Sequence, residues 1–345
     1  MNGVWALVAA VASFVITAAL GKIVIPYLHK LKYGQTILDI GPSWHKNKQG
    51  TPTMGGVMFI VGILATVSVC IPSYYAVSGG GTFHMAETPL MTVKVFAGLA
   101  MALGFGLIGF FDDYIKVVKK RNLGLTARQK MVLQFLVAAA YLATIYITQI
   151  NNGATNTTST IIPFVGSVDL GAFYWILAAI LIVGTVNAVN FTDGVDGLNA
   201  SVTFFVAIFF MVMASFLGMF GMGIAAAALA GGCLGFLVWN FHPAKVFMGD
   251  TGSLFLGGMV CALGFGLNLP ILLLPMGIVY FCEILSVVLQ VIYFKLTKGK
   301  RLFKMSPIHH HFEMCGWSES KICSVFSLVA AVGGIVSLLF TIYGT

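Results

Sequence analysis

The chain has 345 residues, of which 59% are hydrophobic and only 9% are charged. Soluble domains carry about 25% charged residues, so this composition excludes ordinary soluble domains and indicates a membrane protein. The 19 Lys and Arg residues exceed the 11 Asp and Glu residues and give a net charge of +8. In a membrane protein, the placement of surplus Lys and Arg indicates which side of the membrane each connection faces. We therefore expect no nucleic-acid partner.

Ten apolar runs are long enough, or nearly so, to cross a bilayer as helices. None shows the alternation of a membrane barrel, so we expect an all-α polytopic membrane protein with one domain over residues 1–345. The first run lacks the basic start of a cleavable signal peptide and is long enough to span. The expected spans are residues 2–28, 54–72, 92–111, 130–150, 170–190, 198–217, 222–241, 253–268, 270–296 and 321–343.

The connections between these runs alternate in charge. Connections 27–53, 112–130, 242–252 and 295–321 hold 17 of the 19 basic residues, whereas 73–91, 151–169 and 218–221 hold none. The positive-inside rule places the first set in the cytoplasm, and an even number of spans then leaves both termini external. Connection 151–169 is rich in Thr and Asn and reads as a small external hairpin. Pro270 and Pro275 predict a bend in the ninth span.

Residues 45–56 precede the second span and combine cations, a turn and hydroxyl donors. Lys46, Lys48, Thr51 and Thr53 suit an anion clamp. A positively charged topological anchor is the alternative.

Asp112 and Asp113 follow the third run, where a carboxylate is costly to desolvate. They suit metal ligation or general-base chemistry, and a helix cap balanced by Lys116 is the alternative. Adjacent helical residues point about 100° apart, so we expect only one of the two to face a given site.

The segment from residue 187 to residue 198 is the richest in oxygen donors. Asn187 and Asn190 share a helix face, and Asp193 and Asp196 are each followed by glycine in a tight acidic turn. This pattern favours a site for Mg²⁺ or a polar ligand. A capped turn between two helices is the alternative.

Two later cytoplasmic segments complete the set. In residues 247–253, Thr251 or Ser253 is expected to cap the eighth helix, whose N-terminus offers N–H groups to a phosphate beside Asp250. In residues 306–313, three consecutive histidines cannot all ligate one metal from a regular helix or strand. They favour hydrogen bonds to phosphate oxygens, with a solvated basic loop as the alternative.

In this order, the five segments resemble the polyprenyl-phosphate N-acetylhexosamine-1-phosphate transferase family over essentially the whole chain. The stretch from Pro307 to Glu313, with its histidine triplet, resembles the muramoyl branch of that family. The resemblance implies transfer of phospho-N-acetylmuramoyl-pentapeptide from its UDP carrier to undecaprenyl phosphate, with Mg²⁺, giving lipid I and UMP. It also implies peptidoglycan biosynthesis at the bacterial cytoplasmic (inner) membrane and an active-site cleft on the cytoplasmic side, with a homodimer as the candidate assembly.

The resemblance further implies roles for individual residues. Asp250 is the leading Mg²⁺ ligand, with Asn190 as a second donor. Asp112 is the general base for the lipid phosphate and is supported by Asp113, while His309 is also expected to be catalytic. The expected substrate contacts are Lys48, Thr53, Lys130, Asn187, Asn190, Asp193, Gly194, Asp196, Asn240, Phe247, Gln290, His310 and His311.

Two other functions stay open at this point. The near alternative is a transferase for UDP-N-acetylglucosamine. The distant alternative is a transporter, which predicts charges along several spans, whereas Glu283 is the one acid well inside a span.

Overall fold

The structure is a computed structural model and describes residues 2–31, 48–78, 89–118 and 124–344. Lys46, in the expected anion clamp, lies outside the described residues.

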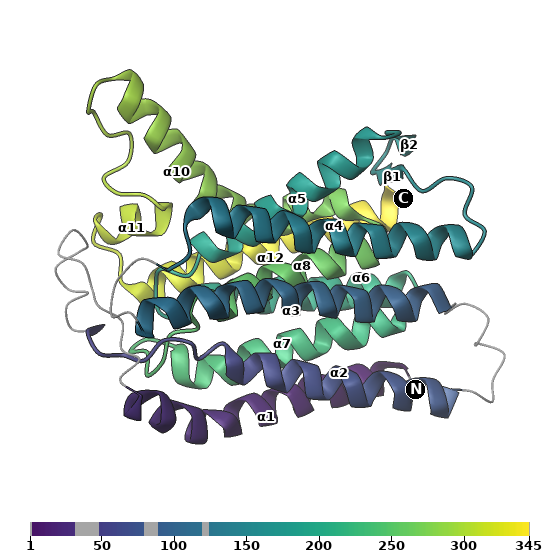
Figure 1. The fold of residues 1–345 in the computed structure, drawn as a ribbon, viewed down its shortest axis with the longest axis horizontal. Helices are drawn as coiled ribbons and strands as arrows, with labels where there is room; N and C mark the ends of the chain where they lie inside the picture. The colour runs from purple at the N-terminus through teal and green to yellow at the C-terminus, as the bar shows by residue number, and fades with distance from the viewer. Residues whose placement is uncertain (1, 32–47, 79–88, 119–123, 345) are drawn as a thin grey trace.

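The described residues form a bundle of long helices with one short hairpin (Figure 1). The helices are continuous where apolar residues run without interruption, because a backbone in lipid must satisfy its own hydrogen bonds. In chain order the elements are α1 (Asn2–Lys30), α2 (Val57–Ser78), α3 (Pro89–Val118), α4 (Ala127–Asn151), β1 (Ser159–Ile162), β2 (Gly166–Asp169), α5 (Phe173–Phe191), α6 (Leu198–Phe216), α7 (Phe220–Asn240), α8 (Gly249–Gly266), η3 (Pro270–Leu272), α9 (Leu273–Met276), α10 (Ile278–Leu296), α11 (Ile308–Glu313) and α12 (Glu319–Tyr343).

Nine helices in the described part of the chain are long and apolar enough to cross a membrane. The remaining long helix, α8, has 18 residues and is therefore about 27 Å long. The all-α polytopic fold is thus confirmed.

The helices run back and forth along one axis, so the two chain termini lie at the same end of the bundle (Figure 1). The C-terminal ends of α3 and α5 and the N-terminal ends of α8 and α12 meet at the opposite end. The alternating direction of the helices thus gathers the predicted polar segments at that opposite end.

Helix α8 is the centre of the bundle. Every residue from Thr251 to Gly266 is buried, and α3 and α5 pack along it. Peripheral helices such as α1 and α10 instead leave large apolar side chains exposed, among them Leu7 and Leu289. Apolar exposure on the rim and burial at the centre are what a bundle surrounded by lipid requires.

The expected small hairpin is present as β1 and β2, which pair antiparallel with Ser159 opposite Asp169. It lies at the end of the bundle that holds the termini (Figure 1).

Three local expectations change. Helix α3 continues to Val118, so Asp112 and Asp113 lie within a helix and not after its end. Helix α8 begins at Gly249 with Met248 as its N-cap and no side-chain cap bond, so the capping role expected of Thr251 or Ser253 is wrong. The hydroxyl groups of both residues have other partners inside the bundle.

The expected ninth span is divided into η3, α9 and α10. Pro270 starts η3 and Gly277 separates α9 from α10. Past this break, α10 leans away from the other helices (Figure 1).

Candidate active site

The end of α3 and the start of α8 carry the central acidic groups of the site. Gly249 begins α8 with a φ of 69°, a left-handed conformation that favours glycine. A Cβ at this position would lie 2.5 Å from Asp113 Oδ2 and 2.8 Å from Thr53 Oγ1. Glycine therefore lets the start of α8 approach both side chains, and it places Thr53 beside Asp113.

Asp112, Asp113 and Asp250 form one carboxylate cluster. Each offers an oxygen that lies within 4.8 Å of the others. Asp113 Oδ2 accepts hydrogen bonds from the Thr251 backbone N–H at 2.9 Å and from its hydroxyl at 2.8 Å. Asp112 Oδ1 accepts from the backbone N–H of Leu125 at 2.8 Å.

The expectation that only one of Asp112 and Asp113 faces the site is wrong. Asp250 comes from a different helix and meets both side chains, because α8 enters the bundle beside the last turns of α3. The side chains of Asp112 and Asp113 leave α3 in different directions, but both are long enough to approach Asp250.

Two lysines neutralise this carboxylate cluster. Lys116 Nζ lies 2.6 Å from Asp112 Oδ2 and 3.2 Å from Asp250 Oδ2. Lys130 Nζ lies 2.9 Å from the same oxygen of Asp250. With all three carboxylates ionised, the two ammonium groups leave the cluster a net charge of −1, which suits a site that attracts a further cation.

The donor set fits Mg²⁺, which prefers carboxylate and carbonyl oxygens. Asn190 contacts Asp250, but through its amide nitrogen, which donates to Asp250 Oδ1 at 2.9 Å and to Ser253 Oγ at 2.7 Å. An oxygen ligand from Asn190 requires this amide to turn over. Asn187 donates to Gln134 Oε1 at 2.6 Å instead, so its amide is held by α4.

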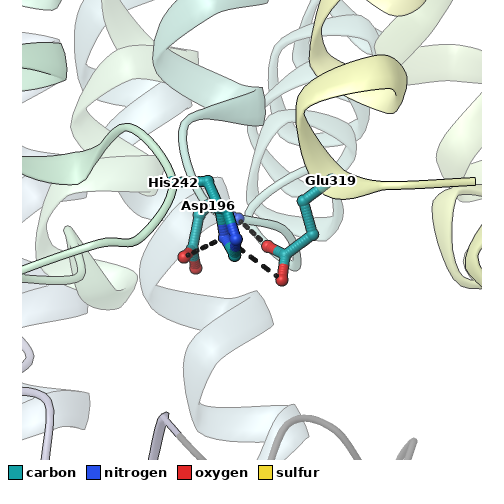
Figure 2. A group of neighbouring side chains, drawn as sticks. All are labelled: Asp196, His242 and Glu319. Atoms are coloured by element: carbon teal, nitrogen blue, oxygen red, sulfur yellow. Dashed lines mark hydrogen bonds and ion pairs between the residues drawn. The ribbon is translucent and has the colours of Figure 1, made fainter.

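A second polar cluster joins segments that are far apart in the sequence. Asp196, His242 and Glu319 come from the turn before α6, the segment after α7 and the start of α12 (Figure 2). His242 Nδ1 lies 3.1 Å from Asp196 Oδ2 and 3.6 Å from Glu319 Oε1. Glu319 Oε2 also accepts from the backbone N–H of Asp196 at 3.0 Å.

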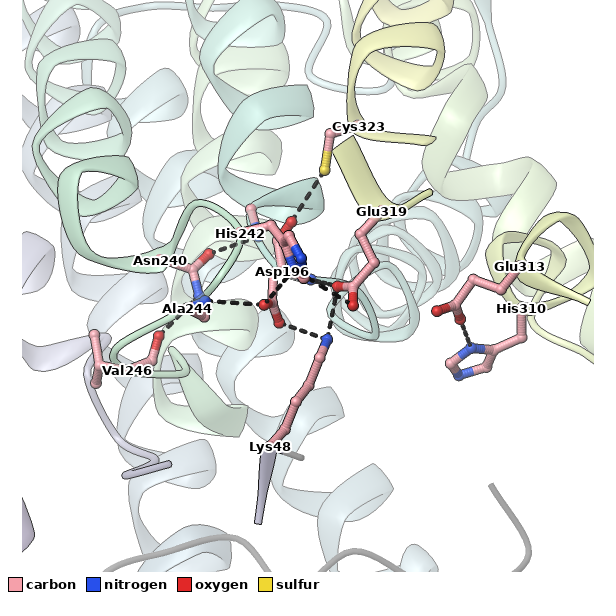
Figure 3. A network of polar contacts seen from close by, with 11 residues as sticks. Lys48, Asp196, Asn240, His242, Ala244, Val246, His310, Glu313, Glu319 and Cys323 are labelled. Carbon is pink, nitrogen blue, oxygen red and sulfur yellow. Dashed lines mark hydrogen bonds and ion pairs between the residues drawn. The ribbon is translucent and has the colours of Figure 1, made fainter. Parts of the chain in front are cut away.

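Lys48 supplies the cation of this second cluster. Its Nζ lies 2.7 Å from Asp196 Oδ1 and 2.6 Å from Glu319 Oε2 (Figure 3). Burial lowers the pKa of Lys48, but hydrogen bonds and charge from Asp196 and Glu319 outweigh that effect and hold the pKa above its ordinary value. Lys48 therefore stays charged and links the segment before α2 to α12.

Asn240 and Phe247 flank the second cluster. Asn240 accepts from the backbone N–H of Gly197 at 3.1 Å and donates to the Val246 carbonyl at 2.9 Å (Figure 3). Phe247 is half-buried, and its backbone is fixed by hydrogen bonds with Pro52 and Gly55. These contacts tie the end of α7 and its following segment to the turn that carries Asp196.

Asp193 lies between the two clusters. Burial raises its pKa well above the ordinary value, and the charges of Asp250, Asp113 and Asp196 raise it further. Asp193 therefore lies close enough to acids of both clusters for their charges to act on its carboxyl.

Gln290 lies apart from the carboxylates. Its amide oxygen accepts from the backbone N–H groups of Leu302 at 3.0 Å and Phe303 at 2.9 Å, and its amide nitrogen donates to the Phe303 carbonyl at 3.0 Å. Its side chain thus fixes the loop after α10.

The three histidines have three different partners. His309 Nδ1 lies 3.0 Å from Glu283 Oε2, and His310 Nδ1 contacts Glu313 Oε2. His311 Nδ1 accepts from the backbone N–H of Lys304 at 3.2 Å. Figure 3 draws His310 and Glu313 to one side of the Lys48 network.

Sequence reasoning did not single out Lys116, Glu319 or His242 as site residues. Lys116 follows Asp112 by four residues and Asp113 by three, a spacing that places it on the same helix face and that could have identified it. Glu319 and His242 carry no such local signal, since their partners lie far away in the sequence.

Comparison with known proteins defines the class of this chain. Residues 95–268 match the family model of glycosyl transferase family 4, and residues 48–60 match signature 1 of phospho-N-acetylmuramoyl-pentapeptide-transferase. The chain therefore belongs to glycosyl transferase family 4.

Curated relatives narrow this assignment. The phospho-N-acetylmuramoyl-pentapeptide-transferase of Desulforamulus reducens is 46% identical over 339 residues, which cover 97% of this chain and 95% of the relative. The proteins of the same name from Caldanaerobacter subterraneus subsp. tengcongensis and Clostridium perfringens are each 46% identical and cover 95% and 94% of this chain and 96% and 93% of their own lengths. Within its class, the chain belongs to the phospho-N-acetylmuramoyl-pentapeptide-transferase family, which confirms the resemblance found in the sequence.

Proposed function

We propose that this chain transfers phospho-N-acetylmuramoyl-pentapeptide from its UDP carrier to undecaprenyl phosphate, giving lipid I and UMP for peptidoglycan synthesis. The observation that carries the proposal is the convergence of Asp112, Asp113 and Asp250 with Lys116 and Lys130 at one end of a membrane bundle. A soluble nucleotide sugar and a lipid phosphate can meet at such an end. Family membership supplies the substrate class.

The reaction joins two anions, so the site must supply positive charge. Lys130 and Lys116 are placed to contact phosphate oxygens, since both reach the carboxylate cluster. Asp112 is proposed as the base that accepts a proton from the lipid phosphate. Asp113, held by Thr251, supports the geometry of that part of the site.

Asp250 is proposed as the leading Mg²⁺ ligand, with Asn190 as a second donor and Asp112 and Asp113 within reach. Bound Mg²⁺ would neutralise charge on the diphosphate and stabilise the leaving UMP. The residues of the chain would then hold the two substrates in line for attack by the lipid phosphate on the phosphorus next to the sugar.

The nucleotide is proposed to bind at the second cluster. Phe247 would stack on uracil, and Asp193, Gly194, Asp196 and Asn240 would line the pocket with Lys48 and Thr53. Lys48 is ion-paired in this structure, so its ammonium must exchange part of that pairing for the ligand. The further proposed substrate contacts are Asn187, Gln290, His310 and His311, of which the two histidines are proposed to hold the sugar-phosphate portion.

The enzyme is proposed to reside in the bacterial cytoplasmic membrane, with the site facing the cytoplasm and both termini outside. Among the described basic residues, Lys48, Lys116 and Lys130 lie at the site end of the bundle, as the positive-inside rule requires of a cytoplasmic site. A homodimer is compatible with this arrangement.

Direct attack is the proposed mechanism, and Asp112→Asn tests it. The variant should lower kcat by about 100-fold or more, because proton transfer contributes about 10² to 10⁴ to a rate. Binding of UMP, measured by calorimetry on purified protein, should change little. A covalent phospho-muramoyl enzyme, found by mass spectrometry after incubation without lipid acceptor, would instead establish a double displacement.

The substrate is tested by competition. UDP-N-acetylmuramoyl-pentapeptide should displace labelled UMP at far lower concentration than UDP-N-acetylglucosamine. Equal or reversed potency would assign the chain to the N-acetylglucosamine reaction.

A further inference from the structure

Glu283 and His309 form a buried pair whose chemistry the proposed function leaves unexplained. Glu283 Oε2 lies 3.0 Å from His309 Nδ1 and accepts from the His309 backbone N–H at 3.4 Å. The two side chains are 0% and 1% exposed. Glu283 lies on α10 and His309 on α11, so the pair joins a membrane helix to the short helix that follows it.

The other edge of the His309 ring faces a backbone. A Cβ added at Gly194 would overlap His309 Nε2 and Cε1. The ring therefore occupies the space that a side chain at residue 194 would need. Only glycine at this position allows His309 to approach the turn.

The ring nitrogens have unequal surroundings. Nδ1 faces a carboxylate, which as an anion only accepts hydrogen bonds, so Nδ1 carries the hydrogen. Nε2 is buried and has no hydrogen-bond partner among the described residues. It faces Gly194 at the start of the turn.

This geometry excludes contact between His309 Nε2 and a substrate in the present conformation, because the atom is covered by the turn it touches. Gly194 lies between Asp193 and Asp196, the two acids of the proposed nucleotide pocket. The ring therefore contacts the turn that carries both acids.

We propose that Glu283 and His309 are positioning residues: Glu283 locks the His309 ring against Gly194, and the ring holds the turn from Asp193 to Asp196 in place. His309 acts on the substrate through this turn and not by direct proton transfer. We refer to the contacts of His309 with Glu283 and Gly194 as the brace. The kinetic consequences of the brace rest on the proposed function, whereas the brace itself does not.

Two isosteric variants separate the ring nitrogens. In His309→Asn the amide nitrogen stands near the position of Nδ1 and keeps the bond to Glu283, whereas His309→Gln places its amide near Nε2 and loses that bond. His309→Asn loses the contact with Gly194 and His309→Gln loses the bond to Glu283, so each breaks one of the two contacts that hold the turn. We expect kcat/KM for the UDP-sugar to fall roughly tenfold or more in both variants. The fall should appear mainly as a higher KM for the UDP-sugar, with the KM for polyprenyl phosphate unchanged.

Glu283 is tested in the same assay. Glu283→Gln keeps an acceptor oxygen and should retain most activity, while Glu283→Leu should match His309→Gln. Cys282→Ala, at the exposed neighbouring position on α10, serves as the matched control. If the loss in either His309 variant is confined to kcat, His309 takes part in chemistry and the brace is wrong.

A size-compensation test needs no turnover. Gly194→Ala should lower the thermal unfolding midpoint of the purified protein, and adding His309→Asn should recover it, because the smaller side chain vacates the space of the new methyl group. Gly184→Ala, where a Cβ meets nothing within 4 Å, is the control and should not lower the midpoint. Additive loss in the double variant would overturn the brace, whereas an inactive wild-type protein with normal compensation would overturn only the proposed function.

Discussion

Asp193 shows how a single residue reports on the electrostatics of the whole site. Its carboxyl lies among acids of both clusters, so burial and the negative charges of Asp250, Asp113 and Asp196 hold its pKa well above the ordinary value. In the unfolded chain the same carboxyl ionises at about pH 4. Between about pH 4 and the raised pKa of Asp193, the folded protein therefore binds one proton more than the unfolded chain does. The free energy of unfolding falls as the pH rises through this interval.

The variant Asp193→Asn should remove this pH dependence. Measured by thermal unfolding in detergent without Mg²⁺, the midpoint of the variant should gain on wild type as the pH is raised from about 4, because asparagine has no proton to lose. Asp169→Asn is the opposite control. Asp169 has a lowered pKa through hydrogen bonds from Thr158 and Gly171, so its replacement should lose stability relative to wild type as the pH rises toward about 4, with no further change above that pH. A difference between Asp193→Asn and wild type that is constant with pH would contradict the account.

At the scale of single residues, the sequence predicted the acids of the site but not their partners. Asp112, Asp113 and Asp250 were identifiable because carboxylates at a membrane boundary are costly and few. The pairing of Lys48 with Glu319, 271 residues apart, was not. It depends on how α12 packs beside the turn before α6, which no local pattern encodes.

At the scale of helices, the contact between α3 and α8 sets the geometry of the carboxylate cluster. A Cβ at Gly109 would overlap the Asp250 carbonyl and lie 2.6 Å from the backbone nitrogen of Thr251. The absence of a side chain at residue 109 thus allows the start of α8 to lie directly against α3.

Gly109→Ala should therefore force the two helices apart. We expect a loss of stability of about 1 to 3 kcal/mol, as for other overpacked cores, and a fall in kcat of roughly tenfold or more through misplaced carboxylates. Unfolding in denaturant and initial rates of UMP release measure the two effects. Gly184→Ala, in open space on α5, should not reduce either quantity. Wild-type behaviour of Gly109→Ala would show that the helices do not need this close contact.

The helices themselves were predictable because lipid demands long apolar runs with internal hydrogen bonds. The ends of the helices were less predictable from the sequence. Helix α3 continues past Asp113, where Lys116 pairs with the two acids within the helix. A prediction from the apolar run alone therefore ends this helix too early. The division at Gly277 was foreshadowed by Pro270 and Pro275, but its position depends on contacts between α9 and α12.

At the scale of the molecule, both ends of the described chain lie at the end of the bundle opposite the site (Figure 1). With the site in the cytoplasm, a membrane-impermeant maleimide added to intact spheroplasts should label Gly344→Cys but not Gly299→Cys, in a background in which the native cysteines are replaced. Gly299→Cys should become labelled after permeabilisation, because the loop after α10 is exposed. Labelling of Gly299→Cys before permeabilisation would invert the proposed topology.

The central claim is that this end of the bundle transfers a phospho-sugar from a nucleotide to a lipid phosphate with the carboxylate cluster and Mg²⁺. Purified protein is incubated with UDP-N-acetylmuramoyl-pentapeptide and undecaprenyl phosphate, and UMP and the lipid-linked sugar are quantified together with and without Mg²⁺ and for Asp250→Asn. The account predicts equal amounts of the two products in the complete reaction and nearly none without Mg²⁺, without the lipid or in the variant. Product formation by Asp250→Asn at the wild-type rate, or no UMP from wild type in the complete reaction, would contradict it.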